Sequence, residues 1–307
     1  MQRVRKQVSV HTIAQKTIKE NISVAVLDSG VGQHPDLFGR VAAFRDFVHG
    51  KRYPYDDSGH GTHVCGIICG SGKASAGKYC GMAPAAQLVV GKVLDSRGDG
   101  STEQMLEGLN WVLQLRKEYS IRILNISVGT TELPGESKRE RLKEKLNQIW
   151  EEGITVVCAA GNQGPDPGTI SALAEGSRVI CVGCHDGEYY RELRGRCDSY
   201  CSRGVPYALP RKPDIVAPGT NIISCSNRYP RELYTAKSGT SMATPIVSGA
   251  IALGLLQEPM LTNEQIKHRL TATATDLGEA WNKQGWGMLN VEAFLNHDRM
   301  EKIESKK

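Results

Sequence analysis

The stretch Asn21-Ile22-Ser23-Val24-Ala25-Val26-Leu27-Asp28 is a short apolar run that predicts a buried β-strand ending at Asp28. Similar runs recur along the chain with helical patterns between them, and they cover residues 87–93, 121–126, 154–158 and 178–182. Strands that alternate with helices predict βαβ units, in which helices cover both faces of a mainly parallel sheet. The sequence therefore predicts an α/β fold.

Capping residues and apolar stripes indicate where helices begin and end. Ser101 and Gln104 form a capping box in front of an apolar stripe at helical spacing. A second stripe stops at Gly153, and Thr262 opens a late helix. We find no internal repeat and no low-complexity linker. We therefore expect one continuous domain over residues 21–296, with a polar N-terminal arm over 1–20 and a polar tail over 297–307.

The composition excludes several classes of protein. The chain has 307 residues, of which 40% are hydrophobic and 23% charged, which excludes collagen-like and coiled-coil designs. The net charge of +5 is small for this length, so we expect no nucleic-acid partner. No apolar run reaches the roughly 18 residues of a membrane span, so we expect no membrane partner. The oligomeric state stays open.

The cysteines indicate a reducing compartment. There are nine, and no apolar segment of a signal peptide follows the basic N-terminus. We expect a cytoplasmic protein without structural disulfides, while secretion by a non-classical route stays open. Cys181 and Cys184 have the spacing of a zinc or redox motif. On a strand, however, side chains three residues apart point to opposite faces, so we interpret both as packing residues.

Four polar residues lie where an α/β sheet can carry chemistry. Asp28 follows a strand, at the edge where such sheets bind ligands. His60 lies between two glycines at the start of an expected helix. Ser241 starts another helix, whose free N–H groups favour a developing negative charge. Asn162 can donate an amide N–H to an oxyanion. Taken alone, Asp28, Ser241 and Asn162 each have a plainer role, as a loop cap, a helix cap and a turn residue.

The combination of these residues is more specific than its parts. In chain order they are flanked by Val-Leu-Asp-Ser-Gly, Gly-His-Gly-Thr-His-Val, Ala-Ala-Gly-Asn and Gly-Thr-Ser-Met-Ala-Thr-Pro. The motifs and their order resemble those of the subtilisin-like serine proteases. The resemblance covers residues 22–294. The chain looks most like the cytoplasmic bacterial branch, because the 27 residues before Asp28 leave no room for the long folding prodomain of secreted members.

The resemblance implies a three-layer subtilisin-like fold with a mainly parallel central sheet flanked by helices. It also implies a serine endopeptidase that hydrolyses peptide bonds through an acyl-enzyme intermediate. His60 would take the proton of Ser241 and return it to the leaving amine, while Asp28 holds the imidazole ring. Asn162 and the Ser241 N–H would bind the oxyanion, and Thr240 would support this site.

The resemblance also implies how a protein or peptide substrate binds. The substrate would add as a strand between two chain edges, at residues 97–100 and 127–129. Small residues would wall a roomy first specificity pocket. The residues implied in substrate binding are Leu94, Gly98, Gly100, Met105, Ser127, Val128, Gly129, Ala159, Ala160, Gly161 and Ser171.

We expect that no cofactor is required. Many family members bind calcium in a loop that corresponds to residues 70–79. Here the loop has no carboxylate and two lysines, whereas calcium needs several oxygen ligands. A weak structural cation site at the carbonyls of residues 169–174 stays open. His60 and His63 lack the carboxylate of a zinc-protease motif, so we expect His63 to be structural.

Two other interpretations of the sequence stay open. One is a pseudoprotease or peptide-binding module that keeps the fold, although the complete set of triad and oxyanion residues counts against it. The other is a maturation protease that cleaves one precursor, which the sequence does not separate from a protease of broad specificity.

Overall fold

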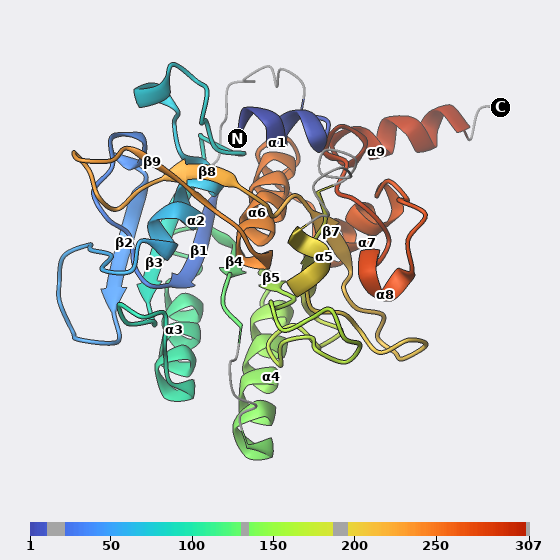
Figure 1. Ribbon diagram of the computed structural model, residues 1–307, viewed down its shortest axis with the longest axis horizontal. Coiled ribbons are helices and arrows are strands. Elements are labelled where there is room, and N and C mark those ends of the chain that lie inside the picture. The colour runs from blue at the N-terminus through green and yellow to red at the C-terminus, as the bar shows by residue number, and fades with distance from the viewer. Residues whose placement is uncertain (11–21, 130–134, 187–195, 305–307) are drawn as a thin grey trace.

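A parallel sheet forms the centre of the molecule (Figure 1). The computed structural model describes residues 1–10, 22–129, 135–186 and 196–304. Within these ranges seven parallel strands pair in the order β2-β3-β1-β4-β5-β6-β7. The strands are β1 (Ser23–Asp28), β2 (Val41–Asp46), β3 (Gln87–Lys92), β4 (Ile121–Ile126), β5 (Thr155–Ala159), β6 (Ile180–Cys184) and β7 (Ile215–Ala217).

The five predicted strands are confirmed to within two residues, as β1, β3, β4, β5 and β6. The sequence does not predict β2, because most of its residues are partly exposed and it forms one edge of the sheet. Nor does it predict β7, which is three residues long. A separate antiparallel hairpin joins β8 (Ile222–Cys225) to β9 (Tyr234–Lys237) and leads into the helix that follows.

Helices cover the sheet in two layers, as the resemblance implies. Helices α2 and α6 pack against each other, and α3 and α4 form a second pair that lies side by side in Figure 1. The capping box predicted at Ser101 is present, and the late helix predicted to open at Thr262 also begins with a capping box. The helices are α1 (Gln2–Gln7), α2 (His60–Cys69), α3 (Thr102–Leu115), α4 (Glu136–Glu151), α5 (Arg196–Tyr200), α6 (Thr240–Gln257), α7 (Asn263–Ala272), α8 (Trp281–Gln284) and α9 (Val291–Glu304).

Helix α6 is the central helix of the core. By length and composition it could cross a membrane, but 83% of it is buried inside the protein. It contacts β4, β5 and β6 as well as α2. A helix that is apolar all round must be surrounded by protein or by lipid, and here the protein itself surrounds it.

The N-terminus is packed against the domain, which corrects the expectation of a polar arm for its first ten residues. Val4 and Val8 are buried one helical turn apart. The Val291 N–H donates to the Val8 carbonyl at 2.9 Å, and the Arg3 guanidinium donates to the Thr220 carbonyl. Residues 11–21 lie outside the described part of the chain. At the other end α9 continues into the expected tail.

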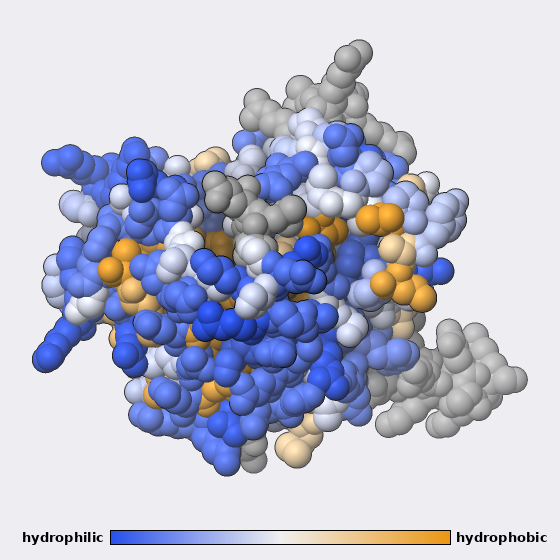
Figure 2. Space-filling view, turned by 90° about the horizontal axis from the view of Figure 1, so that it is seen from below, coloured by the Kyte–Doolittle hydropathy of each residue, from blue (hydrophilic) through white to orange (hydrophobic). Residues whose placement is uncertain are grey.

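The surface is mostly hydrophilic on the face seen from below in Figure 2, with apolar side chains gathered in small groups. One loop carries three large exposed apolar residues, Val205, Tyr207 and Leu209. Small apolar groups of this kind are normal on a globular domain. The apolar core lies between the sheet and its helices.

Candidate active site

The predicted residues lie together at the carboxyl ends of the strands. Asp28 ends β1, and Asn162 follows the end of β5; only β4 lies between these two strands. Neighbouring strands lie about 4.8 Å apart, so the two strand ends are about 10 Å apart. His60 and Ser241 reach the same edge in the first turns of α2 and α6.

Asp28 and His60 form a hydrogen-bonded pair. The His60 ring donates from Nδ1 to Asp28 Oδ1 at 2.7 Å, and the Ser29 N–H donates to the same oxygen at 2.7 Å. Asp28 is completely buried, whereas the His60 side chain is 24% exposed. Oδ2 of Asp28 is also buried and has no hydrogen-bond partner among the described residues. This arrangement fixes the ring and leaves Nε2 to accept a proton.

The electrostatic environment favours a protonated His60. Burial lowers the pKa of His60, but the charge of Asp28 and its hydrogen bond outweigh burial and raise the pKa above its usual value of 6.5. The Lys237 ammonium group, at the end of β9, acts in the opposite direction and lowers this pKa. The charge of Asp28 therefore stabilises the imidazolium that forms when His60 takes a proton.

A buried carboxylate positions the start of the His60 helix. Asp56 accepts hydrogen bonds from the Ser29 hydroxyl at 2.9 Å and from the Thr62 hydroxyl at 2.6 Å. The Ser29 hydroxyl in turn accepts the Gly61 N–H at 2.9 Å. A Cβ on Gly61 would collide with the Gly30 carbonyl, so only glycine allows the helix to approach β1 this closely.

Sequence analysis missed Asp56, Ser29 and Thr62. The sequence does contain a signal for this cluster: Asp56 and Asp57 stand just before the Gly-His-Gly motif. Charged side chains next to a buried helix start need hydrogen-bond or ionic partners.

Asn162 is held by the start of α6. The Thr240 N–H donates to Asn162 Oδ1 at 3.0 Å, and the Thr240 hydroxyl is 3.1 Å from the same oxygen. With the carbonyl end of the amide fixed in this way, the NH₂ end is directed away from Thr240. Asn162 is exposed, while Thr240 is completely buried. Thr240 therefore orients the amide of Asn162, and both of its donors are directed at the Asn162 side chain.

Ser241 lies in the first turn of α6, where backbone N–H groups have no intrahelical acceptor. Among the described residues no hydrogen bond joins the Ser241 hydroxyl to the His60 ring. Catalytic hydrogen bonds are often long without substrate and shorten when it binds. The helix start thus presents a hydroxyl, a free N–H and a positive dipole end beside Asn162.

The resemblance implies a first wall of the specificity pocket at residues 127–129, a second wall at 159–161 and a floor near 168–171, and the two walls lie close together. A Cβ placed on Gly129 would be 3.9 Å from the Cα of Gly161. The Ser171 N–H donates to the Ala160 carbonyl at 2.8 Å, which joins the expected floor to the second wall. Val128 is partly exposed, whereas Ser127 and Ala159 are buried.

The other expected edge lies beside Leu94. A Cβ on Gly100 would crowd the Leu94 side chain at 2.8 Å, and Gly98 faces open space. Leu94 and Met105 are each less than 10% exposed, which is compatible with residues that line the base of subsites.

A buried polar chain supports the first wall. The Asn125 amide donates to the Ser127 hydroxyl at 2.8 Å and accepts from the Ser248 hydroxyl of α6 at 2.8 Å. All three residues are completely buried. The sequence predicts Asn125 only as part of the strand over residues 121–126, although a lone polar residue in an apolar strand is a signal that it needs a partner.

His63 is structural, as expected. Its Nε2 donates to the carbonyls of Ile222 at 2.9 Å and Thr235 at 3.2 Å, which joins α2 to the β8–β9 hairpin. Burial, followed by the charge of His60, lowers the pKa of His63 to about 3. His63 therefore stays neutral at any pH at which His60 titrates.

One group of potential metal ligands lies away from these residues. His34, Asp36 and Cys225 have ligand atoms within 4.8 Å of one another. Both His34 nitrogens are already hydrogen-bonded, to the Asp36 N–H and to a backbone carbonyl. The Tyr234 hydroxyl donates to Asp36 Oδ2 at 2.6 Å, and burial raises the pKa of Cys225 well above its usual value. Protonated or occupied donors do not fit a metal ion.

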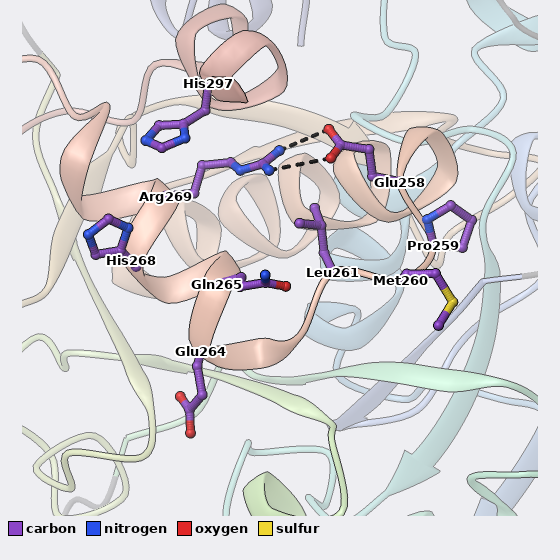
Figure 3. A pocket seen from close by; sticks show the side chains of 9 residues that line it. All are labelled: Glu258, Pro259, Met260, Leu261, Glu264, Gln265, His268, Arg269 and His297. Atoms are coloured by element: carbon purple, nitrogen blue, oxygen red, sulfur yellow. Dashed lines mark hydrogen bonds and ion pairs between the residues drawn. The ribbon is translucent and has the colours of Figure 1, made fainter. Parts of the chain in front are cut away.

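A surface cavity of about 750 Å³ lies at the opposite edge of the sheet (Figure 3). The Arg122 guanidinium, near the amino end of β4, donates to the carbonyls of Pro259 and Leu261 in its lining. In the same lining the Arg269 guanidinium donates to the Glu258 carboxylate at 2.9 and 3.3 Å (Figure 3). The cavity lies at the amino ends of the strands and includes none of the predicted site residues.

Comparison with known proteins identifies the family. The Subtilase family profile matches residues 19–287. Serine protease AprX of Bacillus subtilis (strain 168) is 40% identical over 291 residues, covering 89% of this chain and 66% of AprX. Subtilisin Savinase of Lederbergia lenta is 37% identical over 89% of this chain and 90% of its own length.

A solved structure agrees with the sequence comparison. Sphericase superimposes with a TM-score of 0.80 and 28% identity, over 94% of this chain and 97% of its own. The fold, the motifs and the sequence relatives point to the same conclusion. The chain therefore belongs to the subtilase family of serine endopeptidases.

Proposed function

We propose that Asp28, His60 and Ser241 are the catalytic triad of this chain and that Asn162 lines the oxyanion hole. The observation that carries the proposal is the 2.7 Å hydrogen bond from the partly exposed His60 to the buried Asp28. A histidine held in this way has one ring nitrogen bound to a carboxylate and the other open to a nucleophile.

The arrangement supports peptide-bond hydrolysis in two stages. His60 Nε2 takes the Ser241 proton as the hydroxyl oxygen attacks the scissile carbonyl, and it then protonates the leaving amine. Asp28 holds the ring in the required tautomer and stabilises its charge. The Asn162 amide and the Ser241 N–H donate to the oxyanion, where preorganised donors contribute most. A water molecule then releases the acyl group by the same route.

Covalent labelling by a fluorophosphonate probe tests this proposal, together with hydrolysis of a casein or peptide substrate. We expect stoichiometric labelling at Ser241 and turnover by the same preparation. Labelling at another residue would contradict the assignment. No labelling and no turnover by folded protein would favour the pseudoprotease. Cleavage of a random peptide library separates a protease of broad specificity from a maturation protease with one motif.

We also propose that the chain needs no cofactor or metal for catalysis. The support is that the triad supplies the nucleophile, base and oxyanion donors without a Lewis acid, and that the His34 group has its donors occupied. We expect EDTA to leave activity unchanged and Tm nearly unchanged, as measured by calorimetry against an EDTA-free control. A large fall in Tm would reveal a structural cation, with residues 169–174 as the first place to look.

We propose that the protein works in a reducing, cytoplasmic compartment. The support is that all nine cysteines lie in the described residues as free thiols and that eight are buried. Burial raises the pKa of Cys158, for example, to about 12, which keeps that thiol protonated and unreactive. We expect activity and Tm to be the same with and without millimolar reductant. Loss of folding on reduction would contradict the assignment.

A further inference from the structure

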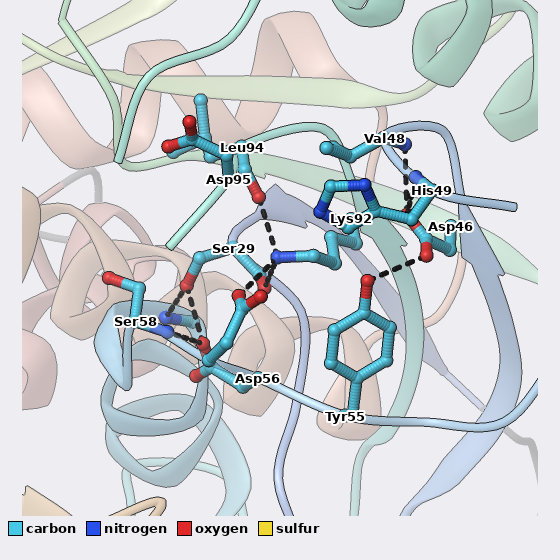
Figure 4. A network of polar contacts seen from close by, with 12 residues as sticks. Ser29, Asp46, Val48, His49, Tyr55, Asp56, Ser58, Lys92, Leu94 and Asp95 are labelled. Atoms are coloured by element: carbon cyan, nitrogen blue, oxygen red, sulfur yellow. Dashed lines mark hydrogen bonds and ion pairs between the residues drawn. The ribbon is translucent and has the colours of Figure 1, made fainter. Parts of the chain in front are cut away.

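Lys92 is a buried lysine at the carboxyl end of β3 that the proposed mechanism does not use (Figure 4). It is completely buried and is among the largest of the fully buried side chains in the described residues. Lysine is almost never buried unless its charge is paired and its protons are accepted. The groups that pair with its charge and accept its protons therefore indicate its role.

The ammonium group contacts three separate segments of the chain. Lys92 Nζ donates to the Ser29 carbonyl at 2.8 Å, to the Leu94 carbonyl at 2.7 Å and to Asp57 Oδ1 at 2.7 Å. An ammonium group has three N–H donors, so these acceptors use all of them. The Tyr55 ring lies next to the cation, with 5.0 Å between Nζ and the ring centroid.

The three segments adjoin residues of the proposed site. Ser29 follows Asp28 directly, and Asp57 lies in the loop that leads into the His60 helix. Leu94 begins the segment expected to bind substrate. The Leu94 N–H also donates to the Asp28 carbonyl, at 3.3 Å. One cation thus connects the triad aspartate, the entry to the histidine helix and a substrate edge.

We propose that Lys92 is a positioning residue that keeps the substrate-binding segment beginning at Leu94 in register with the Asp28–His60 pair. The inference rests on the catalytic roles proposed above. Lys92 has no role in the bond-breaking steps and acts through the groups that it holds. Displacing such groups by about 1 Å can lower the rate by about 100-fold. A methionine has a similar shape but no donors, so Lys92→Met removes the connection and leaves the volume filled.

Two substrates separate positioning from general destabilisation. An extended peptide anilide contacts the segment beginning at Leu94, whereas an ester of one acylated amino acid reaches only the pocket at the scissile bond. For Lys92→Met we expect kcat/KM to fall about 100-fold on the peptide and about tenfold or less on the ester. We expect the loss on the peptide to appear mainly in kcat, because misalignment affects the transition state more than the initial binding.

Lys212→Met is the matched control. Lys212 is also buried, and it donates to Asp214 at 2.7 Å and to the Val179 carbonyl at 3.2 Å. Val179 directly precedes β6, so Lys212 lies at the amino ends of the strands, away from the proposed site at their carboxyl ends. Both variants should lose stability. Only Lys92→Met should change the ratio of the two kcat/KM values, measured well below the Tm of each variant. Equal ratios in the two variants would overturn the proposal.

Asp57→Asn keeps the proposal testable if Lys92→Met does not fold. The Asp57 side chain is 35% exposed, so this variant should fold and lose one charged contact of Lys92. We expect the ratio of kcat/KM on the peptide to kcat/KM on the ester to fall as it does in Lys92→Met, but by a smaller factor. An unchanged ratio would overturn the proposal. Failure of the proposed function is distinguishable, because the wild-type protein would then hydrolyse neither substrate and take up no probe.

Discussion

Ser241→Ala should remove nearly all turnover and all labelling by a fluorophosphonate, while the protein stays folded. The hydroxyl is the proposed nucleophile, and loss of the nucleophile in a subtilisin lowers kcat by about 10⁶-fold. Ser241 is only partly buried, and no hydrogen bond from its side chain is seen in the described residues, so its removal should cost little stability. Steady-state kinetics, mass spectrometry of the labelled protein and circular dichroism measure the three parts of this prediction.

Asn162→Ala provides the contrast for that result. The nucleophile and its base remain, so labelling should slow but persist. We expect kcat to fall by about 10²–10³-fold, because the amide donates to a charge that develops in the transition state. KM should change little. A raised KM with unchanged kcat would show that Asn162 binds the substrate uniformly and that the oxyanion hole is elsewhere.

Asp28→Asn should lower kcat by about 10⁴-fold, because an amide favours the wrong tautomer of His60 and does not stabilise the imidazolium. It should also move the titration of His60. In the wild-type protein Asp28 overcomes the effect of burial and raises the His60 pKa. Without that charge burial dominates, so the His60 pKa should fall.

The pH dependence of activity and an NMR titration test the expected effect of Asp28 on the pKa of His60. His60 acts as a base only when neutral, so wild-type kcat/KM should rise with pH through a pKa above 6.5. His63, with its pKa near 3, does not contribute to this limb. NMR titration of the His60 ring in Asp28→Asn should give a lower pKa than in the wild-type protein. An unchanged or higher value would mean that Asp28 does not control His60.

Short-range patterns in the sequence predicted most of the fold. The apolar run before Asp28, the capping box at Ser101, the helix start at Thr262 and the stop at Gly153 all appear in the structure near their predicted positions. These signals involve residues within about four positions of one another, where side-chain period and capping chemistry act directly. The motifs around His60 also indicated the protease family, because each combines residue type with fixed spacing.

The tertiary structure decided how distant residues support the site. Lys92 contacts Ser29 across 63 positions of sequence, and Thr240 contacts Asn162 across 78. The strand order places β1 between β3 and β4, so the two neighbours of β1 in the sheet are not its neighbours in the chain. No local pattern encodes such pairs, because they form only when the sheet and helices close around a common core. By itself the sequence predicted which side chains carry the proposed chemistry, and folding determined which groups orient and pair them.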